Sequence, residues 1–562
     1  MTPHLHHGQL PNSTALPDDA TDNYDPERQA SMLRSVDAHI ALAHSCLPEL
    51  QALYHQLSQT TKLPALSGLP SFTQALRDGL SSLLKLQAQL QSSSSLTTDA
   101  LTALAQKIDP CMTDISHAAT HWSILRRSTA LVAVNRTFQT SAQSDRRANI
   151  SKFNAAATGR EKSQLHRTLK EQAKTEVDVV AAGAEWLCIR WITRDRLARQ
   201  MTDSGWSWGD YSPGDVVDED EWEDISLAKN IRKLVAAARM HRHEYRIPRL
   251  HIVLPKLSWP DDDVDIPVLL TNLAAIDSGA NITISHAASP FLTAPLPPLA
   301  TSLSNLMHDD LATLTPTLNM DHTILVDLIS DLSHARLTPQ PWQAPTTRAQ
   351  IADENTSPDG VMLRTLHPIL AGRTLLCTRE AAEHFHDMLA TVGTSTERRR
   401  GRLLVPLHQP ESGMDSAAVR SAFQELSAHT IPQDIQLPVK MLPDDERWDV
   451  AAVCAAVENG SLPAVARDVA EKGVGGGTLK SSKLSIYMYG WWSGHATLTS
   501  NKEIKAHMST WVERGRTADD ETGPRIWCVG VTRNLLAKSA EPPPGWTPGH
   551  ENISERGYKP NS

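Results

Sequence analysis

The sequence lacks the paired cysteines of a disulfide framework or a zinc site. Its 562 residues include six cysteines, which are scattered along the chain without a single Cys-x-x-Cys pair. Zinc ribbons require closely spaced thiolates, so this class of protein is excluded. Unpaired cysteines are typical of proteins that work in a reducing compartment.

Long apolar stretches are also missing. No window approaches the ~18 consecutive apolar residues that suggest a membrane-spanning helix. The first residues contain no apolar segment of the kind that secretory signals carry. We therefore expect an intracellular protein, cytoplasmic or nuclear, with no membrane partner.

Positively charged residues are fewer than negatively charged ones. The chain has 54 Lys and Arg against 64 Asp and Glu, which gives a formal net charge of −10 at pH 7. This balance argues against a general binder of polyanions, and any contact with nucleic acid must use a local basic patch.

Changes in composition and periodicity divide the chain into six expected segments. The two ends are polar or rich in Pro and Gly, and we expect both to be disordered. The other four are a helical region, a small central α/β domain, a linker rich in Pro, Ser and Thr, and a C-terminal α/β domain. In chain order the boundaries are 1–26, 27–150, 151–288, 289–316, 317–540 and 541–562.

The helical region has apolar residues at steps of three and four and nothing that suggests catalysis. These residues form three apolar stripes, and the third is expected to end at Pro110. The following stretch, Lys152 to Lys174, is polar and basic. It is either a solvated helix or a mobile linker, and a solvated face is favoured over contact with nucleic acid. We expect the helical region to serve interaction, with a protein partner as the candidate.

The central domain offers one chemical hint. Two strands joined by a turn at Gly183 are predicted, with Asp178 on the first and Glu185 opening the second. Metal-dependent nucleases of the restriction-enzyme type place an Asp and an acidic-x-Lys tripeptide on such a hairpin. Here Leu187 stands where the lysine is needed, so paired solvent-facing carboxylates are the favoured reading.

In the C-terminal domain a short predicted strand ends at Asp321, and an apolar run at helical spacing follows. A carboxylate at the carboxyl end of a strand is where open α/β sheets place their ligands. The alternative is that Asp321 simply caps the helix.

Further acidic junctions follow Asp321. A strand over Arg373–Cys377 leads through Thr378 into a helix whose acids share one face. The remaining junctions open a helix near residue 450 and follow a strand that ends at Thr499. The side chains concerned are Glu380, Glu383, Asp387, Asp445, Asp449, Asn501 and Glu503.

Basic residues lie next to some of these acids. A dense run, Arg398 to Arg402, precedes an expected strand over Leu403–Val405 and is either a phosphate-contacting loop or a soluble turn. The candidate nucleic-acid-binding residues are Arg379, Arg398, Arg399, Arg400, Arg402 and Lys502.

The order of these junctions resembles the PIN (PilT N-terminus) nuclease-like fold. That fold runs from a strand ending in Asp, through a Thr and a helix with an acid, to a Thr-x-Asn junction followed closely by an acid. The whole chain is also similar to a eukaryotic family that joins a helical and α/β N-terminal region to a C-terminal PIN-like domain of unknown function. The resemblance implies a three-layer domain with a mainly parallel sheet.

It also implies a metal-dependent ribonuclease that hydrolyses phosphodiester bonds of RNA with Mg or Mn. The implied catalytic residues are Asp321, Glu383, Asp449 and Glu503, and the implied metal ligands are Asp321, Glu383, Asp445, Asp449 and Asn501. The fourth junction has Asn501 and Glu503 rather than a clear Asp pair. The alternative is therefore a catalytically degenerate module that binds RNA or protein, or a scaffold that acts through its helical region.

Overall fold

The structure is a computed structural model that describes residues 25–60, 66–92, 96–153, 159–307, 309–408, 410–443, 446–480 and 482–547. The chain forms two compact units, which are described separately. Unit 1 comprises Met1–Met240 and Pro248–His308, and unit 2 comprises His241–Ile247 and Asp309–Ser562. Most of the two expected disordered tails lies outside the described residues.

Unit 1 begins with three helices where the periodicity predicts helices. They are α1 (Pro26–Thr60), α2 (Leu69–Ser92) and α3 (Thr98–Leu125). Pro110 does not end the third helix as expected but lies inside it. The buried side chains of Ile115 and Trp122 continue the apolar face of Ile108 past Pro110, and this packing outweighs the hydrogen bond that a proline removes.

A five-stranded mixed sheet packs against these helices. Its order is β1-β2-β3-β4-β5, with antiparallel pairing from β1 to β3 and parallel pairing from β3 to β5. The strands are β1 (Leu131–Gln139), β2 (Lys174–Ala181), β3 (Glu185–Ile189), β4 (Arg249–Leu254) and β5 (Ile282–His286). The predicted β2–β3 hairpin is confirmed, and Gly183 takes φ +67° in its turn. Strand β1, in contrast, falls in the stretch expected to be helical.

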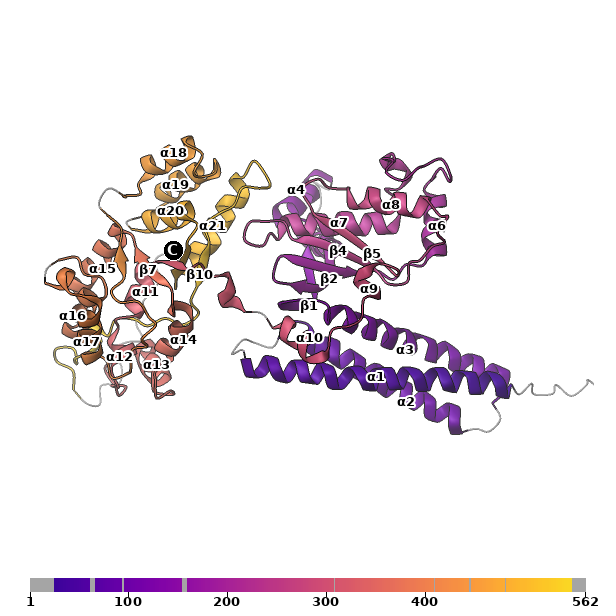
Figure 1. Ribbon diagram of the computed structural model, residues 1–562, viewed down its shortest axis with the longest axis horizontal. Helices are drawn as coiled ribbons and strands as arrows, with labels where there is room; N and C mark the ends of the chain where they lie inside the picture. Colours follow the sequence, from indigo (N-terminus) through magenta and orange to yellow (C-terminus); the bar gives the residue numbers. More distant parts are fainter. Residues whose placement is uncertain are drawn as a thin grey trace, which may run out of the picture. The chain divides into compact units, whose positions relative to one another are not determined.

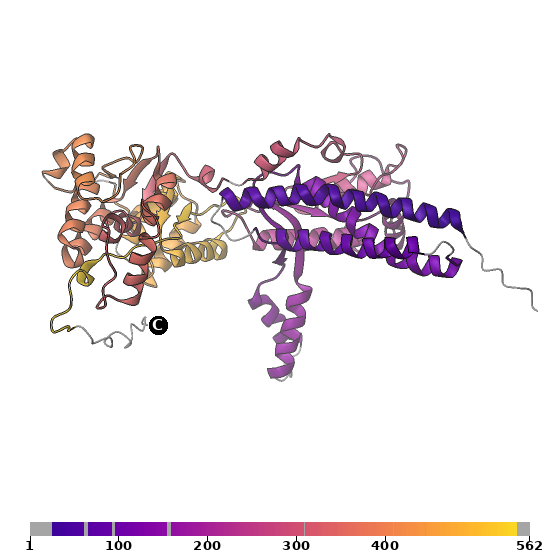
Figure 2. The ribbon, with the colours of Figure 1, turned by 90° about the horizontal axis from the view of Figure 1, so that it is seen from below.

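The helices and the sheet of unit 1 share one hydrophobic core. Leu303 and Leu306, from the expected linker, join it through α10. The other helices of unit 1 are α4 (Gln143–Phe153), α5 (Gly159–Gln172), α6 (Arg194–Asp203), α7 (Ser226–Met240), α8 (Asp265–Ala274), α9 (Pro290–Thr293) and α10 (Leu299–Leu306). Helices α4 and α5 project away from the sheet (Figure 2), and α5 buries none of its residues.

Unit 2 is built on a parallel sheet in the order β10-β9-β6-β7-β8. Its strands are β6 (Thr317–Met320), β7 (Thr374–Cys377), β8 (Lys440–Met441), β9 (Ala496–Thr499) and β10 (Ile526–Cys528). The expected α/β class with a mainly parallel sheet is thus confirmed for the C-terminal part (Figure 1).

Helices alternate with these strands. They are α11 (His322–Asp327), α12 (Asp331–His334), α13 (Pro345–Glu354), α14 (Val361–Leu370), α15 (Arg379–Val392), α16 (Ser395–Leu404), α17 (Ser416–Glu425), α18 (Val450–Glu458), α19 (Val465–Gly475), α20 (Lys483–Ser493) and α21 (Lys502–Gly515). Among all described residues, no helix is long and apolar enough to cross a bilayer.

The strand expected over Leu403–Val405 is absent, because α16 runs through this stretch to Leu404. A capping box between Thr394 and Glu397 starts the helix, and Leu403 and Leu404 belong to its buried face. The basic run Arg398 to Arg402 is therefore helical and not a loop.

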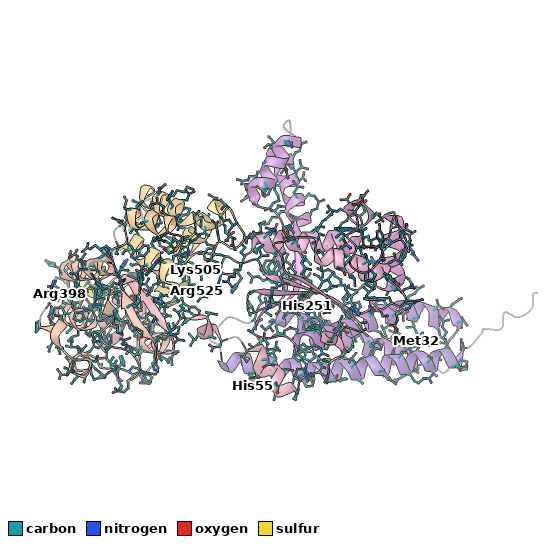
Figure 3. All side chains as sticks on the ribbon, turned by 45° about the horizontal axis from the view of Figure 1, so that its top comes forward. Met32, His55, His251, Arg398, Lys505 and Arg525 are labelled. Carbon is teal, nitrogen blue, oxygen red and sulfur yellow. The ribbon has the colours of Figure 1, made fainter. Side chains whose placement is uncertain are left out.

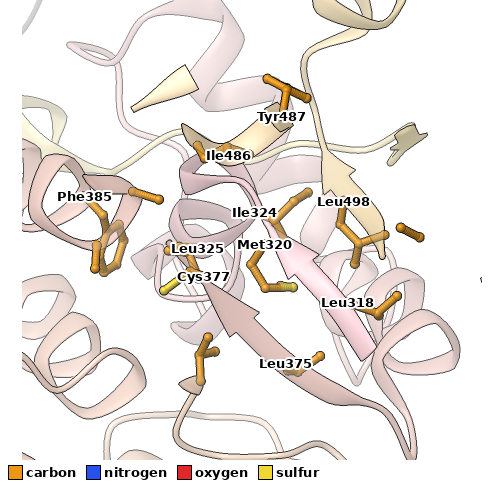
Figure 4. Packing of buried hydrophobic residues seen from close by; sticks show 14 of the residues in the cluster. Leu318, Met320, Ile324, Leu325, Leu375, Cys377, Phe385, Ile486, Tyr487 and Leu498 are labelled. Carbon is orange, nitrogen blue, oxygen red and sulfur yellow. The ribbon is translucent and has the colours of Figure 1, made fainter. Parts of the chain in front are cut away.

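The strand order of unit 2 reverses next to β6. From β6 the chain adds β7 and then β8 on one side, and it returns to place β9 on the other side. Leu318, Met320, Leu375 and Leu498 hold these central strands together through fully buried side chains (Figure 4). The carboxyl ends of β6 and β9 flank the reversal, and open α/β sheets bind ligands at such a point.

Candidate functional site at the carboxyl edge of the parallel sheet

Asp321 lies at the reversal point, directly after β6, and its side chain is almost completely buried. It is also the N-cap of α11, where its Oδ1 accepts a hydrogen bond from the backbone N–H of Thr323 at 3.4 Å. Asp321 therefore caps the helix and also stands at the edge of the sheet where open α/β folds place their ligands.

The carboxylate of Asp321 is surrounded by donors. Its Oδ2 accepts hydrogen bonds from the hydroxyl of Thr499 and, at 3.0 Å, from the phenol of Tyr487. The Nδ1 atom of His322 lies 2.8 Å from Oδ1. Burial raises the pKa of Asp321, but His322, Thr499 and Tyr487 together outweigh it and leave the pKa below its ordinary value. Asp321 is therefore ionised at neutral pH.

Tyr487 comes from α20, a helix that lies in a region the sequence pattern leaves without a role. Its hydroxyl is 3.1 Å from that of Thr499 and thereby joins β9 to Asp321. Burial and the charge of Asp321 raise the pKa of Tyr487 well above its usual range, so it stays a phenol that can donate. The only sequence signal for Tyr487 is a Tyr-x-Tyr pattern within an apolar helix. That pattern is typical of ordinary core residues.

Two imidazoles face each other at this edge. The rings of His322 and His384 meet edge to face with centroids 4.9 Å apart. Burial lowers the pKa of His384, and the charges of His322 and Lys483 lower it further, although Asp387 and Asp321 oppose them. His384 is therefore neutral at pH 7, with Lys483 close enough to influence it.

The carboxylates of the other junctions are occupied elsewhere. Oε1 of Glu383 accepts from Arg379 at 3.1 Å and from Arg447 at 3.2 Å. Asp449 is exposed and caps α18 through the N–H of Ala452 at 2.8 Å.

The fourth junction is used in a similar way. Oδ1 of Asn501 caps α21 by accepting from the N–H groups of Glu503 and Ile504, both at 3.2 Å. The side chain of Glu503 is exposed, and Asp445 lies outside the described residues. Oε2 of Glu380, near the start of α15, is buried and has no hydrogen-bond partner among the described residues.

The described side chains do not fit a Mg or Mn ion. Across the described ranges no group of three or more His, Cys, Asp or Glu is placed to hold a metal. Oδ2 of Asp321 already accepts from two hydroxyl groups, and Oδ1 accepts from the N–H of Thr323 and lies 2.8 Å from Nδ1 of His322. Asp321, Glu383 and Asp449 are thus not brought together as ligands, and metal binding stays a prediction.

The arginines of α16 are mostly engaged within the protein. Arg400 is buried, with its Nη2 2.8 Å from Oδ1 of Asp331 and its Nε donating to the carbonyl of Leu426, so it is not placed to contact phosphate. Arg398 donates to the carbonyl of Leu389 at 3.0 Å, and Arg402 pairs with Glu411 at 3.0 Å.

The two groups of candidate cations lie on different parts of unit 2. Figure 3 shows Arg398 well separated from Lys505. Lys505 belongs to the first turns of α21, the helix that Lys502 opens. Lys502 is exposed and directly follows the junction after β9, whereas the exposed Arg399 belongs to α16.

Comparison with protein-family models, with curated proteins and with solved structures found no match to this chain.

Proposed function

We propose that unit 2 is a PIN-like domain that binds single-stranded RNA at the carboxyl edge of its parallel sheet without cleaving it. The observation that carries this proposal is the way protein groups surround the carboxylate of Asp321. This carboxylate occupies the ligand position of the sheet, yet both of its oxygens already face protein groups: Oδ2 accepts from Thr499 and Tyr487, and Oδ1 lies 2.8 Å from Nδ1 of His322.

The other groups at this edge favour an anionic ligand. Helices α11, α15 and α21 begin directly after β6, β7 and β9, so their N-termini lie at the carboxyl edge. The helix dipole at such termini favours anions. His322, His384, Lys483 and Lys502 add side-chain donors. This set suits phosphate groups, and the resemblance to PIN domains favours RNA as the polymer that carries them.

A second candidate, a metal-dependent endoribonuclease, is favoured by two observations. Asp321 is ionised at the reversal point, and Oε2 of Glu380 is buried without a partner among the described residues. Because the described residues do not fit the metal, no catalytic step is derived for this candidate.

One experiment tests the proposal and separates the candidates. Fluorescence anisotropy with a labelled single-stranded RNA is followed over a salt series, and gel analysis of the same RNA with Mn²⁺ reports cleavage. We expect salt-dependent binding and intact RNA. Cleavage that Asp321→Asn abolishes would establish the nuclease instead. No binding at low salt would reject both and favour a scaffold that acts through α1–α3.

A further inference from the structure

Unit 1 contains a cavity that the function proposed for unit 2 does not use. Its volume is about 590 Å³, within the range of roughly 300–1,000 Å³ that small-molecule sites occupy. Helices α2 and α3 form its walls, and strands β1 to β3 with the following Trp191 form its floor. We call this space the unit 1 cavity.

One buried nitrogen in the unit 1 cavity lacks a partner. His121 is 7% exposed, and its ring hydrogen-bonds to the backbone of Asp178. Its Nε2 has no hydrogen-bond partner among the described residues. Burial lowers the pKa of His121 to about 4 although the bond to Asp178 opposes this, so the ring is neutral. With its other nitrogen donating to a carbonyl, Nε2 is an open acceptor, and such a group is costly to bury unsatisfied.

Acceptors also dominate the rest of the lining. Four carboxylates face the cavity, from Asp78, Asp114, Glu176 and Asp178. Two cations are placed near the floor: Arg190 pairs with Asp178 at 3.2 Å, and Lys256 lies 5.6 Å from the ring centre of Trp191. Burial raises the pKa of both Glu176 and Asp178, although the charge of Arg190 opposes the shift in each case.

Flat and apolar side chains complete the lining. His117 stacks on Trp191 with ring centroids 3.6 Å apart and an interplanar angle of 12°. Phe72 lies 4.8 Å from the ring of His121 and, together with Leu76 and Ile115, supplies apolar surface. The unit 1 cavity therefore pairs acceptors with aromatic and aliphatic surface, a combination that suits alkyl chains ending in ammonium groups.

We propose that the unit 1 cavity binds a small organic polycation of the polyamine class. The ammonium groups would donate to Glu176, Asp114 and Nε2 of His121, and the methylene chain would lie against Phe72 and Trp191. This ligand satisfies the open nitrogen and compensates the surplus carboxylates together, which neither a neutral nor an anionic ligand does. A bare metal ion fits less well, since the described residues form no metal-holding group.

The test uses the full chain and isothermal titration calorimetry with spermidine as the probe. The first variant is Asp114→Asn with Glu176→Gln, both exposed enough to be replaced without disturbing the core. The matched control is Asp99→Asn with Asp109→Asn, which removes the same charge from exposed positions of α3 outside the cavity. We expect one saturable site, at least about tenfold weaker binding in the first variant, and unchanged binding in the control.

A second variant, His121→Phe, tests the open nitrogen directly. We expect it to weaken spermidine binding while the thermal unfolding midpoint shows that the chain is folded. The neutral analogue 1,8-octanediol should not bind. Three results would each overturn the proposal: no saturable binding of spermidine at low salt, equal weakening by the first variant and its control, or equal affinity for the diol.

Discussion

Tyr487 donates a hydrogen bond to Asp321 across 3.0 Å, although the two residues are 166 positions apart in the chain. The bond joins α20 to the end of β6 and satisfies a carboxylate that is removed from water. The bond therefore contributes to the stability of unit 2, and it also sets the surroundings of the carboxylate at the edge where we propose that a ligand binds.

Replacing Tyr487 by Phe removes this bond while keeping the ring. A hydrogen bond to a buried charged group contributes about 1.5–3 kcal/mol, so we expect a loss of unfolding free energy on that order. Urea denaturation measures it. Tyr54→Phe, at a 48% exposed position of α1, is the control and should change little. Equal stability of the two variants would show that water or another donor replaces the phenol.

Asp327 makes the unfolding free energy of unit 2 depend on pH. Burial raises its pKa from 3.8 to about 6, although Arg533, Ser500 and Thr532 donate to it. A carboxyl whose pKa is higher in the folded chain contributes stability below its unfolded pKa and loses it as the pH rises through the folded one. Relative to Asp327→Asn, the wild type should therefore lose on the order of 2–3 kcal/mol between pH 4 and pH 7.

Chemical denaturation at several pH values measures this difference. The exposed Asp359→Asn variant is the control, and its difference from the wild type should stay flat over the same range. A flat profile for Asp327→Asn as well would mean that Asp327 is already ionised at pH 4.

The buried pair of Arg400 and Asp331 should be structural. Arg400→Ala leaves Asp331 buried with only the hydroxyls of Thr394 and Thr396, and breaking such a pair costs about 3–5 kcal/mol. Arg399→Ala, one position earlier and exposed, should stay within about 0.5 kcal/mol of the wild type. Thermal unfolding compares the two. If both variants were equally mild, the pair would not hold α12 against α16.

RNA binding should depend on the lysines of the edge more than on α16. Lys483→Ala with Lys502→Ala removes two of the proposed phosphate contacts, so we expect about tenfold weaker binding and a salt slope shallower by about 1.4. Arg467→Ala with Lys472→Ala on α19, whose cations pair with Glu458 and Asp468, should leave both quantities unchanged.

The triple variant of Arg398, Arg399 and Arg402 to Ala tests the other surface. Arg398 and Arg402 have partners within the protein, so we expect nearly unchanged affinity. A loss confined to this triple variant would place the RNA path on α16.

The sequence could predict the central strands of unit 2 because each is a short apolar run, and Leu318, Leu375 and Leu498 mark three of them. It could also predict that Asp321 stands at a strand end beside a helix. It could not predict Tyr487 as its partner, since a contact across 166 positions has no local pattern. The expected strand over Leu403–Val405 failed because a buried helical face and a buried strand look alike over three residues.

Unit 1 should tolerate changes of length and sequence in the projecting helices α4 and α5. Strands β1 and β2 are direct neighbours whose ends meet, with Gln139 opposite Lys174 and the N–H of Thr140 bonded to the carbonyl of Ala173. The described residues between Thr140 and Ala173, which form α4 and α5, are therefore an insertion into a simple hairpin. Because the free-energy cost of closing a loop grows only with the logarithm of its length, this segment can be shortened or exchanged for a foreign insert while the sheet keeps its register.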